Sequence, residues 1–296
     1  MPGITIAALI TILILLCLVS LVILRGMTRW DRLFAVLSML LAGAAFFGAY
    51  HLLRLPLDHA LHGLLSGDPI SYRWIASLYA PLTEEPAKWI VLIPLFAAGR
   101  IKRENKGAWA VCLGFGFGIG EIVFLAQSIA SNPLAPNLPW YTSSGFMVER
   151  LMVCVIHSAL FLIAIEAISS RKFWLILLAP VFHWLLNFPI FLSIQFPFAD
   201  GGILWSQLLW TWTTLFFIAS LILLGSQLFN STERMASILG RAVCPECQTL
   251  YVRPWRGINR IGKRYERCPN CMHDHWTTLY TGDNNKTADK TPHSPE

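Results

Sequence analysis

Seven long apolar stretches constrain the fold of this chain more than any other feature of its sequence. They cover residues 4–24, 33–53, 74–98, 107–131, 145–169, 173–195 and 203–225. Each is close to the roughly 20 residues that a helix needs to cross about 30 Å of hydrocarbon. With 55% hydrophobic and only 14% charged residues, the chain is also too apolar for an ordinary water-soluble domain. The sequence predicts an all-α polytopic membrane protein with about seven transmembrane helices.

The basic residues between these stretches predict the orientation of the chain. Nine of them follow the first, third and fifth stretches: Arg25, Arg29, Arg32, Arg100, Lys102, Arg103, Lys106, Arg171 and Lys172. The opposite loops hold Arg54 and Arg73. Because Lys and Arg accumulate in cytoplasmic loops, we expect the N-terminus outside and the C-terminus in the cytoplasm. The short loops suggest a bacterial plasma membrane as the location. This asymmetry beside anionic lipid also explains the net charge of +6, so charge indicates no nucleic-acid partner.

The composition changes after the last apolar stretch. We expect a transmembrane domain at 1–230, a linker at 231–243, a small cytosolic module at 244–280 and a disordered polar tail at 281–296. The module contains Cys244-Pro-Glu-Cys247 and Cys268-Pro-Asn-Cys271, two pairs separated by twenty residues. This spacing predicts a zinc ribbon, in which four thiolates hold one structural zinc and leave no open position for catalysis. A pair of disulfides is the alternative, but a reducing cytoplasm favours the metal.

The neighbouring His273 and His275 are further candidate ligands, although exposed histidines are the simpler interpretation. The remaining cysteines, Cys17, Cys112 and Cys154, lie in apolar stretches and are interpreted as small buried residues.

Five ionisable residues lie deep inside the apolar stretches: Glu84, Glu85, Glu121, His157 and His183. One charge at the bilayer centre costs about 2.5–3.5 kcal/mol on insertion scales, so such groups are expected to face one another. At 1.5 Å of rise per residue, they lie roughly 15–21 Å into their helices, at matching depths. The alternative is structural: Glu84 or Glu85 pairs with Lys88, Arg150 pairs with Glu149 or Glu121, and the histidines are hydrogen-bonded packing residues. Five groups at one depth favour a single polar site.

Neighbouring residues add detail to this site. Lys88 lies four residues after Glu84, and Asn187 four after His183, while Arg150 is two turns from His157. The glycines at 114, 116, 118 and 120 form two small-xxx-small pairs, which permit close approach of neighbouring helices. Pro81, Pro86 and Pro94 remove helix hydrogen bonds around the glutamate pair, which predicts a hydrated pocket beside it.

These residues resemble the ordered motifs of PrsW-type intramembrane proteases, which are related to the CAAX prenyl protease and bacteriocin-processing family. The resemblance covers residues 74–190: Glu84-Glu85-Pro-Ala-Lys88, Gly114-Phe-Gly-Phe-Gly-Ile-Gly-Glu121, the stretch from Arg150 to His157, and His183-Trp-Leu-Leu-Asn187. It implies endoproteolysis of a membrane-embedded or juxtamembrane segment of another protein, such as an anti-sigma factor. Ile122 departs from the family, which usually has Asn after this glutamate, and the ribbon lies outside the family's core. The ribbon would serve a cytosolic partner or the substrate's tail.

Peptide hydrolysis needs an activated water, stabilisation of the oxyanion and a proton for the leaving amine. Glu84 or Glu85 is the candidate base, and crowding of the two carboxylates is expected to keep a proton on one of them. Glu121, His157 and His183 would either hold a catalytic zinc or stabilise the oxyanion as neutral donors, helped by Asn187. The absence of an H-E-x-x-H motif favours a metal-independent glutamate mechanism. Two other functions fit the sequence: a proton-coupled transporter, and a non-catalytic scaffold that displays the ribbon.

Overall fold

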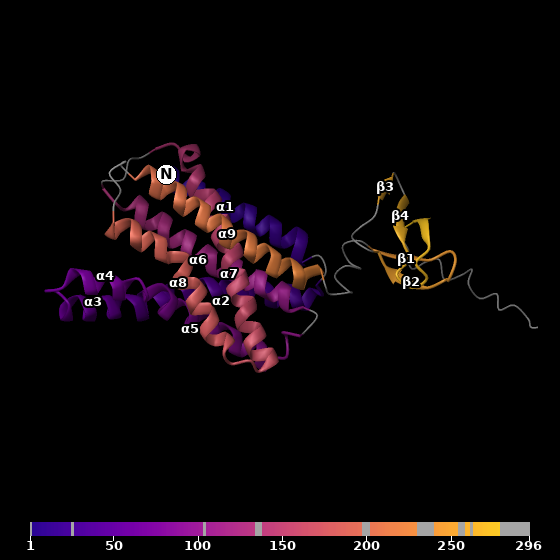
Figure 1. Ribbon diagram of the computed structural model, residues 1–296, viewed down its shortest axis with the longest axis horizontal. Helices are drawn as coiled ribbons and strands as arrows, with labels where there is room; N and C mark the ends of the chain where they lie inside the picture. Colours follow the sequence, from indigo (N-terminus) through magenta and orange to yellow (C-terminus); the bar gives the residue numbers. More distant parts are fainter. Residues whose placement is uncertain are drawn as a thin grey trace, which may run out of the picture. The chain divides into compact units, whose positions relative to one another are not determined.

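The computed structural model describes residues 2–24, 27–102, 105–133, 138–196, 202–229, 240–253, 258–260 and 263–278. The chain divides into two compact units, Met1–Leu228 and Phe229–Glu296. The first unit is helical and the second contains short strands (Figure 1). The predicted disordered tail at 281–296 lies outside the described residues.

Among its described residues, the helical unit has six helices that are long and apolar enough to cross a membrane. They are Gly3–Leu21, Arg29–Leu64, Lys106–Ala130, Trp140–Ser170, Leu175–Gln195 and Ile203–Leu228. Many large apolar side chains on these helices are exposed, as expected where a helix faces lipid rather than water. The helices suggest a multi-pass membrane protein.

The remaining predicted span, 74–98, is divided in the structure. Its first residues belong to the short helix α4 (Pro69–Ala76), and the rest form α5 (Tyr79–Ala97). Helix α5 has 19 residues, but three of them are the charged Glu84, Glu85 and Lys88. The number of membrane crossings therefore depends on how this one helix is counted.

The second long helix continues past the predicted end of its span at residue 53. It consists of α2 (Arg29–Gly48), a π-helical segment (Ala49–Arg54) and α3 (Leu55–Leu64). The helical path runs on through Pro56, which lies in the first turn of α3 directly after the π-helical segment. Helix α3 lies beside α4, and the two project from the bundle (Figure 1).

The centre of the bundle is α6 (Lys106–Ala130), whose backbone is in close contact with α7 (Ser144–Ser170). A Cβ on Gly114 would lie 2.3 Å from the Ser158 Cα, and one on Gly118 would lie 2.4 Å from the Cys154 Sγ. Real Cβ atoms do not approach other atoms so closely, so this face of α6 accepts only glycine.

The opposite face of α6 makes an equivalent contact with α2. A Cβ on Gly116 would lie 2.3 Å from the Met39 carbonyl oxygen, and one on Gly120 would lie 2.5 Å from the Gly43 carbonyl oxygen. The two glycine pairs therefore serve two different neighbours, and the predicted close approach is confirmed. This packing fixes α6 between the helices that carry the polar residues described below.

Two further helices, α8 (Leu175–Gln195) and α9 (Ile203–Phe229), complete the unit. The Trp212 indole N–H on α9 donates to the Leu185 carbonyl oxygen at 2.9 Å. Two prolines lie inside α5, Pro86 and Pro94, yet the helix is continuous, while Pro81 lies in its first turn. The prolines therefore do not break the helix at the glutamate pair.

The second unit consists of two small antiparallel sheets. Strands β1 (Arg241–Val243) and β2 (Leu250–Val252) form one, and β3 (Ile258–Arg260), β4 (Lys263–Arg267) and β5 (Asp274–Thr277) form the other in that order. Because β1 pairs with β2, the module begins at least three residues before the predicted boundary at residue 244.

We expect Gly114→Ala to destabilise the helical unit, because the new methyl group meets the backbone of α7 at 2.3 Å. Overpacking of this kind costs about 1–3 kcal/mol. Thermal unfolding of the purified chain in detergent would show a lower Tm. The matched control is Gly48→Ala at the end of α2, where a Cβ meets nothing within 4 Å. Equal Tm values for the two variants would contradict the close α6–α7 contact.

Candidate functional site

A partly open cavity of about 510 Å³, lined by both polar and apolar side chains, lies in the helical unit. Six of the eight residues predicted for the membrane site line it: Glu84, Glu121, Arg150, His157, His183 and Asn187. They come from α5, α6, α7 and α8, four helices that meet here although their residues are up to about a hundred positions apart in the chain. The other two predicted residues, Glu85 and Lys88, are buried beside the cavity lining.

His183 lies between the two adjacent glutamates of α5. Its Nδ1 is 2.6 Å from the Glu85 Oε1, and its Nε2 is 3.8 Å from the Glu84 Oε2. The two carboxylates point in different directions, as consecutive residues of a helix must. Glu84 reaches the cavity, and Glu85 reaches the protein interior. The imidazole therefore links a cavity carboxylate to a buried one.

Lys88 is fully buried and forms an ion pair with Glu85, with 2.5 Å between Nζ and Oε1. The sequence spacing suggested Glu84 as its neighbour, but the pair formed is three residues apart rather than four. The ammonium group also lies 4.9 Å from the centre of the Phe117 ring, which adds a cation–π contact. Since Glu84 and Glu85 each have their own cationic partner, crowding of charge no longer predicts a shared proton.

Arg54 is the partner of Glu84, and the sequence gave no reason to select it. Its Nη2 donates to the Glu84 Oε1 at 2.9 Å. Arg54 was assigned to an external loop, whereas it ends the π-helical segment that joins α2 to α3. Single π-helical turns are often found at functional sites. The run of apolar residues on both sides of Arg54 was the signal that the helix continues.

The opposite side of the cavity carries a second carboxylate cluster. Glu121 Oε1 lies 2.7 Å from the Arg150 Nη1, and Glu121 Oε2 lies 3.1 Å from the His157 Nε2. Arg150 also contacts the carboxylate of Glu149. The rings of His157 and His183 are 5.8 Å apart between centroids, so the two clusters are adjacent.

Simple pairing therefore accounts for part of this arrangement, because Lys88 and Arg150 each neutralise a glutamate. Hydrogen-bonded histidines are the other part of that alternative, and each of the two bonds a different carboxylate beside the same cavity. Within the described ranges, Glu121, His157 and His183 do not meet as a group that could hold a metal ion. The geometry thus gives no support to a catalytic zinc at these three residues.

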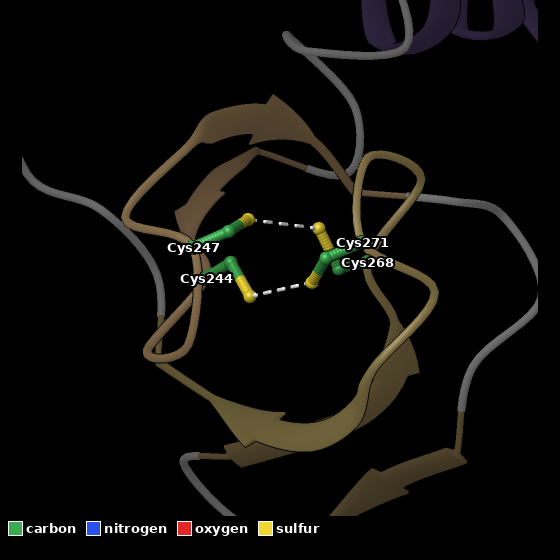
Figure 2. A group of neighbouring side chains, drawn as sticks. All are labelled: Cys244, Cys247, Cys268 and Cys271. Atoms are coloured by element: carbon green, nitrogen blue, oxygen red, sulfur yellow. Dashed lines mark hydrogen bonds between the residues drawn. The ribbon is translucent and has the colours of Figure 1, made fainter.

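The four cysteines of the second unit form a cluster that could bind a structural metal. Their sulfur atoms all lie within 4.8 Å of one another, and each pair points toward the other (Figure 2). The Sγ atoms of Cys244 and Cys271 are 3.6 Å apart, and those of Cys247 and Cys268 are 3.7 Å apart. Tetrahedral thiolates about 2.3 Å from a zinc ion would be separated by nearly the same distance, about 3.8 Å. All four cysteines are free of disulfides.

Each cysteine pair is held by a tight turn with the same backbone geometry. The Gln248 N–H donates to the Cys244 carbonyl oxygen, and the Met272 N–H donates to the Cys268 carbonyl oxygen. Gln248 and Met272 have positive φ angles of 54° and 61°, in the left-handed region that lets the chain reverse. The two turns have the same geometry, and they direct both pairs of sulfur atoms toward one point.

The surroundings of Cys247 favour its thiolate form, because side-chain and backbone hydrogen bonds with Thr249 lower the pKa of its thiol to about 5. At Cys271 a backbone hydrogen bond with His273 acts in the same direction, but desolvation and the neighbouring sulfur atoms raise the pKa of that thiol to about 12. The side-chain amide of Asn270 donates to the Cys247 Sγ at 3.7 Å, and its backbone N–H donates to the Cys268 Sγ at 3.4 Å. Because metal ions bind thiolates, these donors prepare the cluster for a metal.

His275 is neither exposed nor a ligand, which corrects the sequence interpretation. It is 7% exposed, and its Nε2 lies 3.0 Å from the Tyr251 hydroxyl. That hydroxyl donates to the Glu266 Oε1, which also accepts from Thr277. The described part of the chain places the four cysteines alone in the metal cluster, and neither His273 nor His275 joins them. A buried polar network rather than a large apolar core supports this module.

No protein-family model, no curated protein and no solved structure matches this chain.

We expect Lys88→Met to destabilise the helical unit by about 3–5 kcal/mol, because it leaves the buried Glu85 carboxylate without its cation. The double variant Glu85→Gln/Lys88→Met should recover part of that loss, which thermal unfolding in detergent would measure as a double-mutant cycle. Lys106→Met is the control, because its pair with Glu166 is partly exposed and worth at most about 1 kcal/mol. Additive effects at positions 85 and 88 would contradict the coupling.

We expect Cys247→Ser and Cys268→Ser to remove bound metal from the purified full-length chain. Each change deletes one of four sulfur ligands, and a small module loses much of its folding free energy with its metal. Mass spectrometry of the metal content should show about one ion per intact chain and little in either variant. Cys17→Ser, at an exposed position on α1 (Gly3–Leu18), is the matched control and should retain the ion. Metal retained by the ribbon variants would contradict the assignment.

Proposed function

We propose that the chain is an intramembrane endopeptidase that hydrolyses a peptide bond in a membrane-embedded or juxtamembrane segment of another protein. The observation that carries this proposal is the placement of His183 between a cavity carboxylate and a buried carboxylate. The resemblance of residues 74–190 to PrsW-type proteases supports the same reaction, with an anti-sigma factor or other regulatory membrane protein as the substrate.

Glu84 is the candidate general base, because it lines the cavity and Glu85 does not. The 3.8 Å between Glu84 Oε2 and His183 Nε2 is too long for a direct hydrogen bond, and it suits one bridging water. Glu85 accepts a hydrogen bond from His183 Nδ1–H, which would leave Nε2 as the acceptor that orients this water. Glu85 is thus a positioning residue, and Lys88 fixes Glu85 in turn.

The hydrolytic steps follow from this assignment. Glu84 takes a proton from the water as the water oxygen bonds to the scissile carbonyl carbon. The carbonyl oxygen becomes an oxyanion, which accepts a hydrogen bond from the Asn187 side-chain amide at the cavity wall. The C–N bond then breaks, and the proton on Glu84 passes to the leaving amine. No metal ion is needed in this sequence.

We assign to the second cluster, around Glu121, the binding of the substrate rather than the activation of the water. Glu121 is held by Arg150 and His157, so it is a poor acceptor for a further proton. A fixed row of polar groups opposite Glu84 provides donors and acceptors for the backbone of an extended segment. The cavity volume of about 510 Å³ is within the usual range for ligand sites.

The second unit is proposed to be a zinc ribbon. The four sulfur atoms are the donor set that zinc prefers in structural sites, and their separations match a tetrahedral ion. The zinc would hold the two cysteine turns together and would take no part in hydrolysis. From the asymmetry of the basic loops, we propose that this ribbon and the C-terminus are in the cytoplasm with the N-terminus outside, which requires α5 to be a seventh crossing.

The test is the appearance of new peptide termini near membrane segments in cells that express the chain. Quantitative proteomics should find such termini with the intact chain and lose them with Glu84→Gln, Glu85→Gln and His183→Ala, each at equal abundance. Glu166→Gln is the matched control, because Glu166 pairs with Lys106 and lies outside the polar cavity. It should cleave like the intact chain.

Identical profiles for all the chains would reject the peptidase. A transporter would then be indicated if Glu84→Gln abolished proton-dependent uptake into vesicles. A scaffold would be indicated if only the cysteine variants changed the phenotype of the cells.

A further inference from the structure

The three-stranded sheet of the second unit has an exposed row of apolar and aromatic side chains. Ile258 is opposite Tyr265, and Tyr265 is opposite Trp276, so the three residues cross all three strands in register. They are 68%, 37% and 45% exposed. The rings of Tyr265 and Trp276 are in contact, with 5.3 Å between centroids. A small module that leaves such a row open to solvent presents an interaction surface.

The alternation of the strands separates this row from the buried network. In β4, Arg264 and Glu266 are buried, whereas Lys263, Tyr265 and Arg267 are exposed. Side chains two residues apart in a strand lie on one face, so Lys263 and Arg267 flank the aromatic row. We call this surface, made of Ile258, Lys263, Tyr265, Arg267 and Trp276, the outer face.

The charge of the module complements an anionic surface. Residues 241–280 contain seven basic residues, Arg241, Arg253, Arg256, Arg260, Lys263, Arg264 and Arg267, against three acidic ones, Glu246, Glu266 and Asp274. Arg253 and Arg264 are buried beside the buried Glu266, which leaves five basic and two acidic residues to set the charge of the surface. On the outer face, Arg267 is paired with Asp274 at 2.7 Å, and Lys263 adds positive charge beside the rings. Tyr, Trp and Lys together are the side chains that gather where membranes meet water, since each has an apolar body and a polar end.

The covalent connection keeps the module near a membrane. Helix α9, which is long and apolar enough to span a bilayer, ends at Phe229, and β1 begins at Arg241. Eleven residues lie between them, and twelve Cα–Cα steps of about 3.5 Å limit that separation to roughly 40 Å. A tether of this length gives a high effective concentration of the module at the lipid headgroups. The connection favours lipid over nucleic acid, which would also accept exposed aromatic rings and basic residues.

We propose that the outer face docks on anionic lipid headgroups, with Tyr265 and Trp276 at the interface and Lys263 beside the lipid phosphates. This inference does not rest on the peptidase activity. It gives the ribbon a role in holding the cytosolic end of the chain against the membrane.

Hydroxyl-radical footprinting of the full-length chain in lipid nanodiscs tests the docking, because it reports the solvent accessibility of individual side chains. In discs with about 30% phosphatidylglycerol, the oxidation rates of Tyr265 and Trp276 should fall by about threefold or more relative to neutral phosphatidylcholine discs. High salt should reverse the fall, because it screens the attraction. Lys263→Glu should remove most of it, and the matched control Arg241→Glu, an exposed position in the other sheet, should retain it. Unchanged oxidation of the buried Tyr251 verifies that both variants are folded.

Three outcomes would overturn the proposal. Equal oxidation rates in anionic and neutral discs would show that lipid charge is not recognised. Equal loss of protection in Lys263→Glu and Arg241→Glu would show that net charge acts without the outer face. Protection that appears only on addition of a single-stranded oligonucleotide would assign the outer face to nucleic acid instead.

Discussion

The neutralisation of buried charge is the constraint on which the rest of the structure depends. A helix such as α5 can carry two glutamates inside an apolar bundle because each one meets its own cation, Arg54 for Glu84 and Lys88 for Glu85. An unpaired charge there would cost several kcal/mol. Lys88 comes from α5 itself, whereas Arg54 is delivered by the segment that follows α2. The close glycine contact of α6 with α2 restrains the helix that leads to Arg54, because backbones in contact leave little freedom to shift.

These ion pairs also give the two glutamates different positions and therefore different roles. Glu85, Lys88 and His183 form a buried set with short contacts, whereas Glu84 lies at the cavity wall between Arg54 and the free edge of the imidazole. A rigid interior that supports one cavity carboxylate is an arrangement suited to acid–base chemistry, since the supporting groups fix the orientation of the reacting one. The proposed peptidase uses this division directly.

The second unit is stabilised in a different way from the helical unit. It is too small for a large apolar core, and it combines four convergent cysteines with a buried network around Glu266. Because its interior is filled by these polar and sulfur groups, aromatic residues are left on the surface, where they are available for the proposed lipid contact.

The sequence by itself indicated the class of the protein and six of the residues that line the cavity. Apolar length indicated membrane helices, the Cys-x2-Cys spacing indicated the metal cluster, and charge in apolar surroundings selected Glu84, Glu121, His157 and His183, because such placement is costly anywhere else. Only the tertiary structure decided which side chains are partners. It assigned Lys88 to Glu85 rather than Glu84, brought Arg54 into the site, and kept His275 out of the cysteine cluster. Those choices depend on rotamers and on contacts between helices far apart in the chain, which spacing along one helix does not encode.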